Sequence, residues 1–131
     1  MSKVTEHFNL DEFKCNCLKC SFTNIDYILV VVLELVREHF KQPIYITSGN
    51  RCFEYNYKIG GYKQSKHIPS VDMNGQTYAT AVDFYVKDVD VWKVYAYLDK
   101  MFPSFFGIGV AEKSKFIHLD SRLDKAHRWE Y

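Results

Sequence analysis

The chain has 131 residues, of which 47% are hydrophobic, 17% aromatic and 25% charged, and its formal net charge is +1. This length and composition predict one globular domain over residues 1–131 and exclude a disordered chain. The charge is close to zero and no basic run occurs, so nucleic-acid binding is not expected. The longest apolar run, residues 28–33, is far too short to cross a bilayer.

The first half of the chain predicts a long helix followed by a strand. A short helical turn is expected at residues 8–13. Thr23-Asn24-Ile25-Asp26 resembles a capping box, and the apolar residues after it recur at helical spacing. Gln42-Pro43 ends this helix. Residues 43–47 are β-branched and apolar, which favours a strand, and residues 53–59 predict a short helix.

The second half predicts three strands and another long helix. Residues 68–78 carry Pro and Gly and are expected to form a loop, with a small hairpin at Asn74-Gly75. An apolar strand follows at residues 79–86, and helical spacing returns at residues 89–102. The last two strands, joined as a hairpin, are predicted at residues 105–110 and 115–120.

This element order predicts an α+β fold, with a small, mostly antiparallel sheet covered by helices. Trp129, in the tail, is expected to fold back onto the domain.

The four cysteines allow two interpretations. The N-terminus lacks the apolar segment of a signal peptide, so we expect synthesis in the cytoplasm, where disulfides are disfavoured. The cluster Cys15-x-Cys17-x2-Cys20 then either holds a structural zinc, with Cys52 or a histidine as the fourth ligand, or consists of free or partly oxidised thiols.

Two histidines and one carboxylate are candidate metal ligands. Alone, His67 and His118 could be hydrogen-bonded core residues, and Asp83 could cap a strand or pair with a cation. Asp83 lies in an apolar strand, however, where a carboxylate is costly to bury without a partner. Considered together with Ser48-Gly49-Asn50-Arg51 and Gly60-Gly61, they favour a catalytic zinc site with an open position.

These residues belong to a wider pattern, which resembles the zinc D-Ala-D-Ala carboxypeptidase and L-Ala-D-Glu endopeptidase family. That family has the hedgehog/DD-peptidase fold, cuts peptidoglycan stem peptides and includes phage endolysins. The resemblance extends from His7-Phe8 to Arg128-Trp129. The motifs that carry it are Ser48-Gly-x-Arg51, Tyr55-Asn56, Gly60-Gly61, Ser65-x-His67, Ala81-x-Asp83 and Phe116-Ile-His118-x-Asp120.

The resemblance implies that His67, Asp83 and His118 bind Zn²⁺. It also implies that Arg51 stabilises the developing oxyanion or anchors a substrate carboxylate. The alternative for Arg51 is a surface ion pair that stabilises a turn.

The general base is harder to place. Many family members have an acid three residues before the last ligand, where this chain has Lys115. Glu112 lies six residues before His118, a spacing similar to that of the site glutamate in hedgehog domains, so we predict Glu112 as the base. The alternative is that Glu112 is an exposed turn residue. Asp120 is the other candidate, or it orients a ligand.

The link between the first two ligands is longer than in the family. His67 and Asp83 are 16 residues apart, and residues 68–78 form an insertion beside the site. Asp72 within it is a rival ligand, but Ala81 keeps its place before Asp83 and favours Asp83. Three tyrosines are candidates to line a peptide groove: Tyr55, Tyr62 and Tyr78.

The function implied by the resemblance is a monomeric zinc peptidase that acts on peptidoglycan, as a D,D-carboxypeptidase or an endopeptidase. It would reach the cell wall after lysis or by virion delivery, as a phage lysis or entry enzyme. Lys115 favours the alternative, a catalytically inactive zinc-binding module with a structural or wall-recognition role. A thiol enzyme based on Cys52 lacks an obvious partner histidine in the sequence.

Overall fold

A five-stranded sheet forms the centre of the molecule, for which a computed structural model describes residues 3–17 and 19–131. The strands lie in the order β3-β6-β8-β7-β9. All neighbours are antiparallel except β9, which runs parallel to β7. The α+β prediction with a mostly antiparallel sheet is confirmed. The strands are β3 (Ile44–Ser48), β6 (Ala81–Val86), β7 (Gly107–Ala111), β8 (Phe116–Asp120) and β9 (His127–Glu130).

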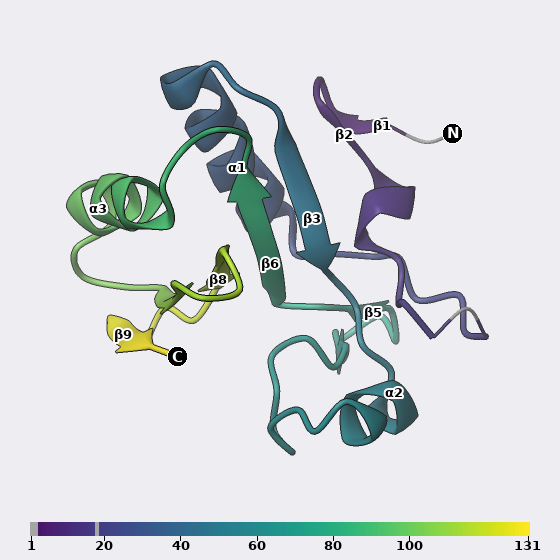
Figure 1. The fold of residues 1–131 in the computed structure, drawn as a ribbon. Helices are drawn as coiled ribbons and strands as arrows, with labels where there is room; N and C mark the ends of the chain where they lie inside the picture. The colour runs from purple at the N-terminus through teal and green to yellow at the C-terminus, as the bar shows by residue number, and fades with distance from the viewer. Residues whose placement is uncertain (1–2, 18) are drawn as a thin grey trace.

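Two long helices, α1 (Tyr27–Phe40) and α3 (Val91–Met101), pack against the sheet, while α2 (Phe53–Lys58) lies beyond the end of β3 (Figure 1). Both long helices were predicted. None of the helices in the described part of the chain has the length and apolar character needed to cross a bilayer. The remaining elements are β1 (Lys3–Thr5), β2 (Phe8–Asn9), the 3-10 helix η1 (Leu10–Phe13), β4 (Ser70–Val71) and β5 (Thr77–Tyr78).

The start of α1 differs from the predicted capping box. Asp26 is the N-cap, and its carboxylate accepts a hydrogen bond from the N–H of Ile28 at 3.2 Å. Residues 24–26 are extended instead, because their backbone pairs with Ala79 on both sides. This backbone pairing prevents Thr23 from capping the helix.

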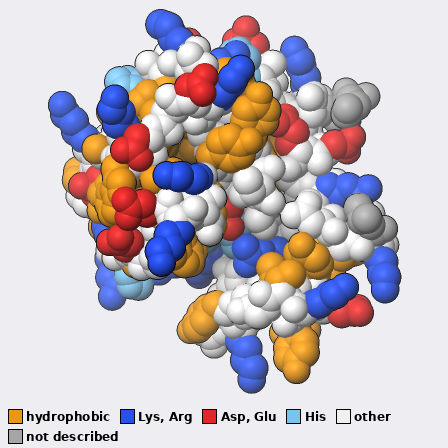
Figure 2. Space-filling model, in the orientation of Figure 1, with side chains coloured by type: hydrophobic (Ala, Val, Ile, Leu, Met, Phe, Trp, Pro, Cys, Tyr) orange, Lys and Arg blue, Asp and Glu red, His pale blue; other side chains and the backbone are white. Residues whose placement is uncertain are grey.

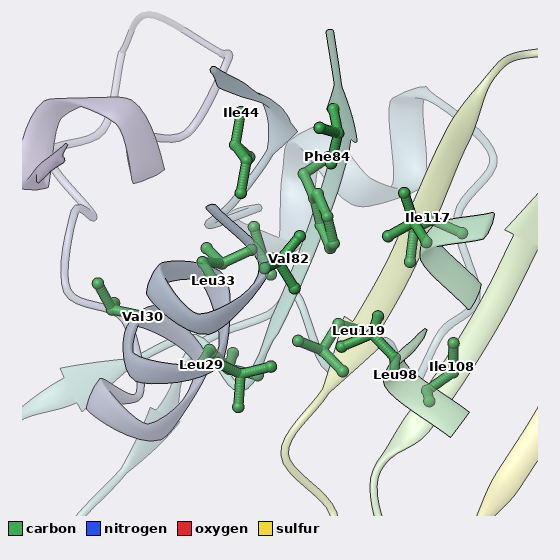
Figure 3. Close-up of a cluster of buried hydrophobic side chains, with 14 of the residues drawn as sticks. Leu29, Val30, Leu33, Ile44, Val82, Phe84, Leu98, Ile108, Ile117 and Leu119 are labelled. Atoms are coloured by element: carbon green, nitrogen blue, oxygen red, sulfur yellow. The ribbon is translucent and has the colours of Figure 1, made fainter. Parts of the chain in front are cut away.

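The core lies between the helices and one face of the sheet (Figure 3). Because side chains alternate along a strand, every second residue of β6, β7 and β8 points to the helices. Leu29 and Leu33 from α1 and Leu98 from α3 pack against that face. The strand residues they cover are Val82, Phe84, Ile108, Ile117 and Leu119.

The opposite face of the same strands carries the polar residues. Asp83 is the register partner of His118, and Gly109 is the partner of His118 on the other side. Asp120 faces Gly107, where a Cβ atom would collide with the Asp120 carboxylate. The alternation that builds the core therefore also places an aspartate and a histidine side by side on the outer face.

Candidate metal centre

Three buried side chains meet on this outer face of the sheet. Asp83 comes from β6 and His118 from β8, and His67 reaches them from the loop after α2. Their exposed fractions are 2% for His67, 4% for Asp83 and 6% for His118. One ligand atom from each lies within 4.8 Å of the others. The structure thus brings together the three predicted metal ligands.

Hydrogen bonds define which atom of each imidazole faces the centre. His67 Nδ1 donates to the carbonyl oxygen of Gly49 at 2.7 Å, since a carbonyl can only accept. His67 Nε2 therefore faces the centre, 3.1 Å from Asp83 Oδ1. In His118, Nε2 donates to Asp120 Oδ2 at 2.9 Å, which leaves Nδ1 facing Asp83 Oδ1 at 3.0 Å. Two imidazole nitrogens thus converge on one carboxylate oxygen.

The charges at this centre depend strongly on each other. Burial alone would raise the pKa of Asp83, but the nearby His67 and His118 imidazoles outweigh it and hold that pKa well below its usual range. Burial lowers the pKa of His118, while its hydrogen bonds to Asp120 and Asp83 outweigh burial, so the net pKa is raised. Asp83 is therefore anionic at neutral pH, as a metal-binding carboxylate must be.

A second carboxylate, Asp120, binds the nitrogen of His118 that faces away from Asp83. It is fully buried, and Arg122 donates to it from Nε at 2.7 Å and from Nη2 at 2.8 Å. The N–H of Gly107 adds a bond at 3.1 Å. Such a carboxylate–imidazole pair fixes the tautomer and ring orientation of a metal ligand.

Arg51 binds the carboxylate oxygen of Asp83 that does not face the histidines. Its Nη2 donates to Asp83 Oδ2 at 3.1 Å, its Nε to Ser48 Oγ at 3.0 Å and its Nη1 to Asn56 Oδ1 at 3.3 Å. Since Arg51 takes Oδ2, Oδ1 of Asp83 stays directed at the histidines. Three of the five N–H donors of the guanidinium are engaged in these bonds.

The centre opens into a cleft of about 880 Å³. Arg51 and Tyr62 line it, together with His127, Trp129 and Tyr131 from the C-terminal segment. The hydrophobic side chains on the lower part of the molecule, over α2, lie beside this region (Figure 2). The ligands are therefore reachable by a molecule the size of a short peptide.

Two imidazoles and one carboxylate, with an open side, form the ligand set of a catalytic zinc ion. The residues present thus fit Zn²⁺. A family model described as Peptidase M15 matches residues 6–120 of this chain. The chain belongs to the peptidase M15 family. The predicted family resemblance is confirmed, and membership indicates a metallopeptidase. No match was found among curated proteins or solved structures.

Other predicted residues of this M15 peptidase family member lie away from the cleft. Glu112 is exposed at the turn after β7 and does not line the cleft. Gly109 is the register partner of His118, and Glu112 follows it by three residues. Three residues of extended strand span about 10 Å, which separates Glu112 from the position beside His118. Glu112 as the base therefore stays a prediction. Asp72 is exposed and accepts bonds from Asn74 and Gln76 within the β4–β5 hairpin.

The C-terminal strand β9 supplies cleft residues that the sequence did not predict. Trp129 lies against His118, with ring centroids 5.0 Å apart. A Cβ atom on Gly109 would approach Trp129 to 2.6 Å, so the glycine makes room for the indole. His127 also lines the cleft, and its Nδ1 contacts Arg122. The expectation that Trp129 folds back is confirmed, but its pairing as a strand depends on β7.

Proposed function

We propose that this protein is a zinc-dependent peptidase that cleaves peptidoglycan stem peptides, with His67, Asp83 and His118 as the zinc ligands. The observation that supports it best is the convergence of His67 Nε2 and His118 Nδ1 on Asp83 Oδ1 in an open cleft. Each of these ligands is oriented by a separate partner: Gly49, Asp120 and Arg51. Membership of the M15 family agrees with this proposal.

When bound, Zn²⁺ supplies Lewis acidity, which activates water and polarises an amide carbonyl. The protein's part is to hold the ligands and to stabilise charge. Arg51 lines the cleft beside Asp83, and we assign its remaining N–H donors to the developing oxyanion or to a substrate carboxylate.

The charge of the cleft supports an anionic peptide as substrate. Four cationic side chains line it, and three of them, all arginines, pair with Asp83, Asp120 or Asp99. Lys66 is the exposed member of the cationic set, and within the described residues its ammonium makes no ion pair. Stem peptides carry free carboxylates, which Lys66 and Arg51 are placed to bind. The cations are Arg51, Lys66, Arg122 and Arg128.

Proton transfer has two candidate residues. Glu112 remains the predicted base, at the exposed turn after β7. His127 is an imidazole of the cleft that lies outside the proposed ligand set. An imidazole takes up a proton through a ring nitrogen, so His127 can act as the base through Nδ1 only when Arg122 no longer donates to that atom. Asp120 is a poor base, because its oxygens already accept bonds and its pKa is held well below the usual range: burial would raise that pKa, but His118 and Arg122 outweigh it.

The test is release of new amino groups from purified peptidoglycan. We expect release by the zinc-loaded wild-type protein, loss on chelation, recovery on adding zinc, and loss in His118→Ala. Lys125→Ala, at an exposed position outside the cleft, is the matched control. Absence of release by a protein with full zinc content would contradict the peptidase proposal. It would favour the inactive zinc-binding module instead.

A further inference from the structure

A second group of metal-binding side chains lies apart from the His67 centre. The Sγ atoms of Cys15, Cys17, Cys20 and Cys52 all lie within 4.8 Å of one another. Cys15, Cys17 and Cys20 come from the segment after η1, and Cys52 immediately precedes α2. Cys15 is buried and the other three are half-buried. Two segments that are distant in the sequence thus contribute to one sulfur cluster.

The spacing of these sulfurs fits a metal better than disulfides. Cys17 Sγ and Cys20 Sγ are 3.4 Å apart. A disulfide needs about 2.0 Å. A tetrahedral zinc site with Zn–S bonds of about 2.3 Å places its sulfurs about 3.8 Å apart. All four cysteines are free thiols in the structure, and each sulfur lies near the other three rather than near a single partner.

Backbone N–H groups point at three of the four sulfurs. Cys17 Sγ accepts from the N–H of Lys19 and of Cys20, both at 3.3 Å. Cys15 Sγ accepts from the N–H of Cys52 at 3.3 Å, and Cys52 Sγ accepts from Tyr55 at 3.4 Å. N–H donors stabilise the anionic form of a cysteine, which is the form that binds metals.

The protein holds this cluster in place through contacts other than the sulfurs. The N–H of Cys15 donates to the carbonyl of Phe22 at 3.1 Å, which closes the loop that carries Cys17 and Cys20. Asn50 binds the carbonyl of Phe13 through its backbone N–H at 2.9 Å and through its side chain at 2.8 Å. These bonds fix the Cys52 side of the cluster against the Cys15 side.

We propose that Cys15, Cys17, Cys20 and Cys52 form a closed, tetrahedral Zn²⁺–thiolate site, separate from the His67 centre. Four protein ligands leave no open position, so the role is structural. The site joins Cys15 to Cys52, 37 residues apart. Cys52 follows Arg51, whose guanidinium binds Asp83, so the thiolate site also anchors the turn that supports the other metal centre. Of the fourth ligands considered from the sequence, this selects Cys52 over a histidine.

Zinc content measured under reducing conditions tests the proposal. We expect two zinc ions per chain in the wild-type protein and one in His67→Ala/His118→Ala. We expect one also in Cys17→Ser/Cys20→Ser, with the His67 centre still loaded. A wild-type protein with one zinc that is lost in His67→Ala/His118→Ala would overturn the proposal. None of these readouts uses peptidase activity, so they can fail independently of the proposed function.

Cobalt replacement identifies the ligands even if the cysteine variant does not fold. In His67→Ala/His118→Ala all four cysteines are intact, and bound Co²⁺ should show the strong near-ultraviolet absorption of thiolate-to-cobalt charge transfer. In protein denatured in the presence of a chelator, four thiols should react with a thiol reagent. In the native zinc-loaded protein, the same thiols should react markedly more slowly. Absence of the charge-transfer absorption, or a Cys17–Cys20 disulfide in reduced, zinc-supplied protein, would contradict a tetrathiolate site.

Discussion

Asp120 Oδ2 accepts a hydrogen bond from His118 Nε2 at 2.9 Å, from the same strand and the same face. The bond fixes the ring orientation of His118, so that Nδ1 rather than Nε2 faces Asp83. Arg122 in turn fixes the Asp120 carboxylate. A chain of three side chains therefore determines which imidazole nitrogen is available to a metal.

Replacing Asp120 by Asn should weaken zinc binding at the His67 centre. The neutral amide removes the charge that fixes His118, and outer partners of this kind contribute about 10- to 100-fold in metal affinity. Competition with a chromogenic chelator measures the affinity. Asp124→Asn, on the exposed segment before β9, is the matched control. Unchanged affinity in Asp120→Asn would show that His118 is oriented by other means.

Replacing Arg51 by Lys should lower peptidase activity more than zinc content. Lys keeps the positive charge but cannot make the three separate bonds of the guanidinium to Ser48, Asn56 and Asp83. Removal of one oxyanion donor costs about 100- to 1000-fold in kcat. Zinc analysis and kinetics on the same preparation separate the two effects. Equal losses of zinc and activity would leave Arg51 with a structural role only.

Glu112→Gln and His127→Gln distinguish the two candidate bases. The variant that removes the base should lower kcat with little change in KM, because a general base acts in the transition state rather than in substrate binding. The other variant should retain activity within about 2-fold, because substitutions outside the reacting groups have small effects. The pH dependence of kcat/KM on the wild-type protein gives a third measurement. A large loss in Glu112→Gln alone would identify Glu112 as the base, and a large loss in His127→Gln alone would identify His127.

Gly107→Ala and Gly109→Ala should have different consequences, although both add a methyl group to β7. The new Cβ at residue 107 collides with the Asp120 carboxylate, so zinc affinity should fall. At residue 109 it meets Trp129, so the change should appear in tryptophan fluorescence and in the packing of β9. Each variant should lose about 1 to 3 kcal/mol of unfolding free energy, measured by denaturant titration. Loss of zinc affinity in Gly109→Ala alone would contradict the assignment.

Glu34 should make the stability of the wild-type protein depend on pH in a defined direction, and Glu34→Gln should remove that dependence. The Glu34 carboxylate accepts the N–H of His7 at 2.8 Å and contacts His7 Nδ1 at 2.7 Å. Burial raises the pKa of Glu34, but hydrogen bonds from the N-terminal segment outweigh burial and lower it below the ordinary 4.5. A lowered folded-state pKa stabilises the protein above pH 4.5, and this stabilisation is lost as pH falls through the folded-state pKa.

We therefore expect the unfolding free energy of the wild-type protein to exceed that of Glu34→Gln by about 1 kcal/mol at pH 7. This difference should narrow below pH 4.5. Glu38→Gln, whose exposed carboxylate pairs with Lys41, is the matched control and should show almost no gap in unfolding free energy. Chemical denaturation at several pH values gives both comparisons. A gap that widens on acidification would show that Glu34 does not stabilise the fold in its charged form.

The sequence alone determined the elements whose residues carry a local pattern. The spacing of Leu29, Leu33 and Val36 predicted α1, and the apolar runs predicted β3 and β6. It also determined the choice of His67, Asp83 and His118, through motifs that resemble the M15 family. These features depend on periodicity or on residue identity, both of which can be read along the chain.

Only the tertiary structure decided which residues that are distant in the sequence are neighbours in space. Strand β9 forms because β7 offers an edge and Gly109 leaves space for Trp129, and neither condition is visible in residues 127–130. The same holds for Cys52 beside Cys15 and for the exposed place of Glu112. The sequence shows which residues of a single strand share a face. The candidate metal centre and the cleft depend in addition on the register between strands and on the course of the loops between them.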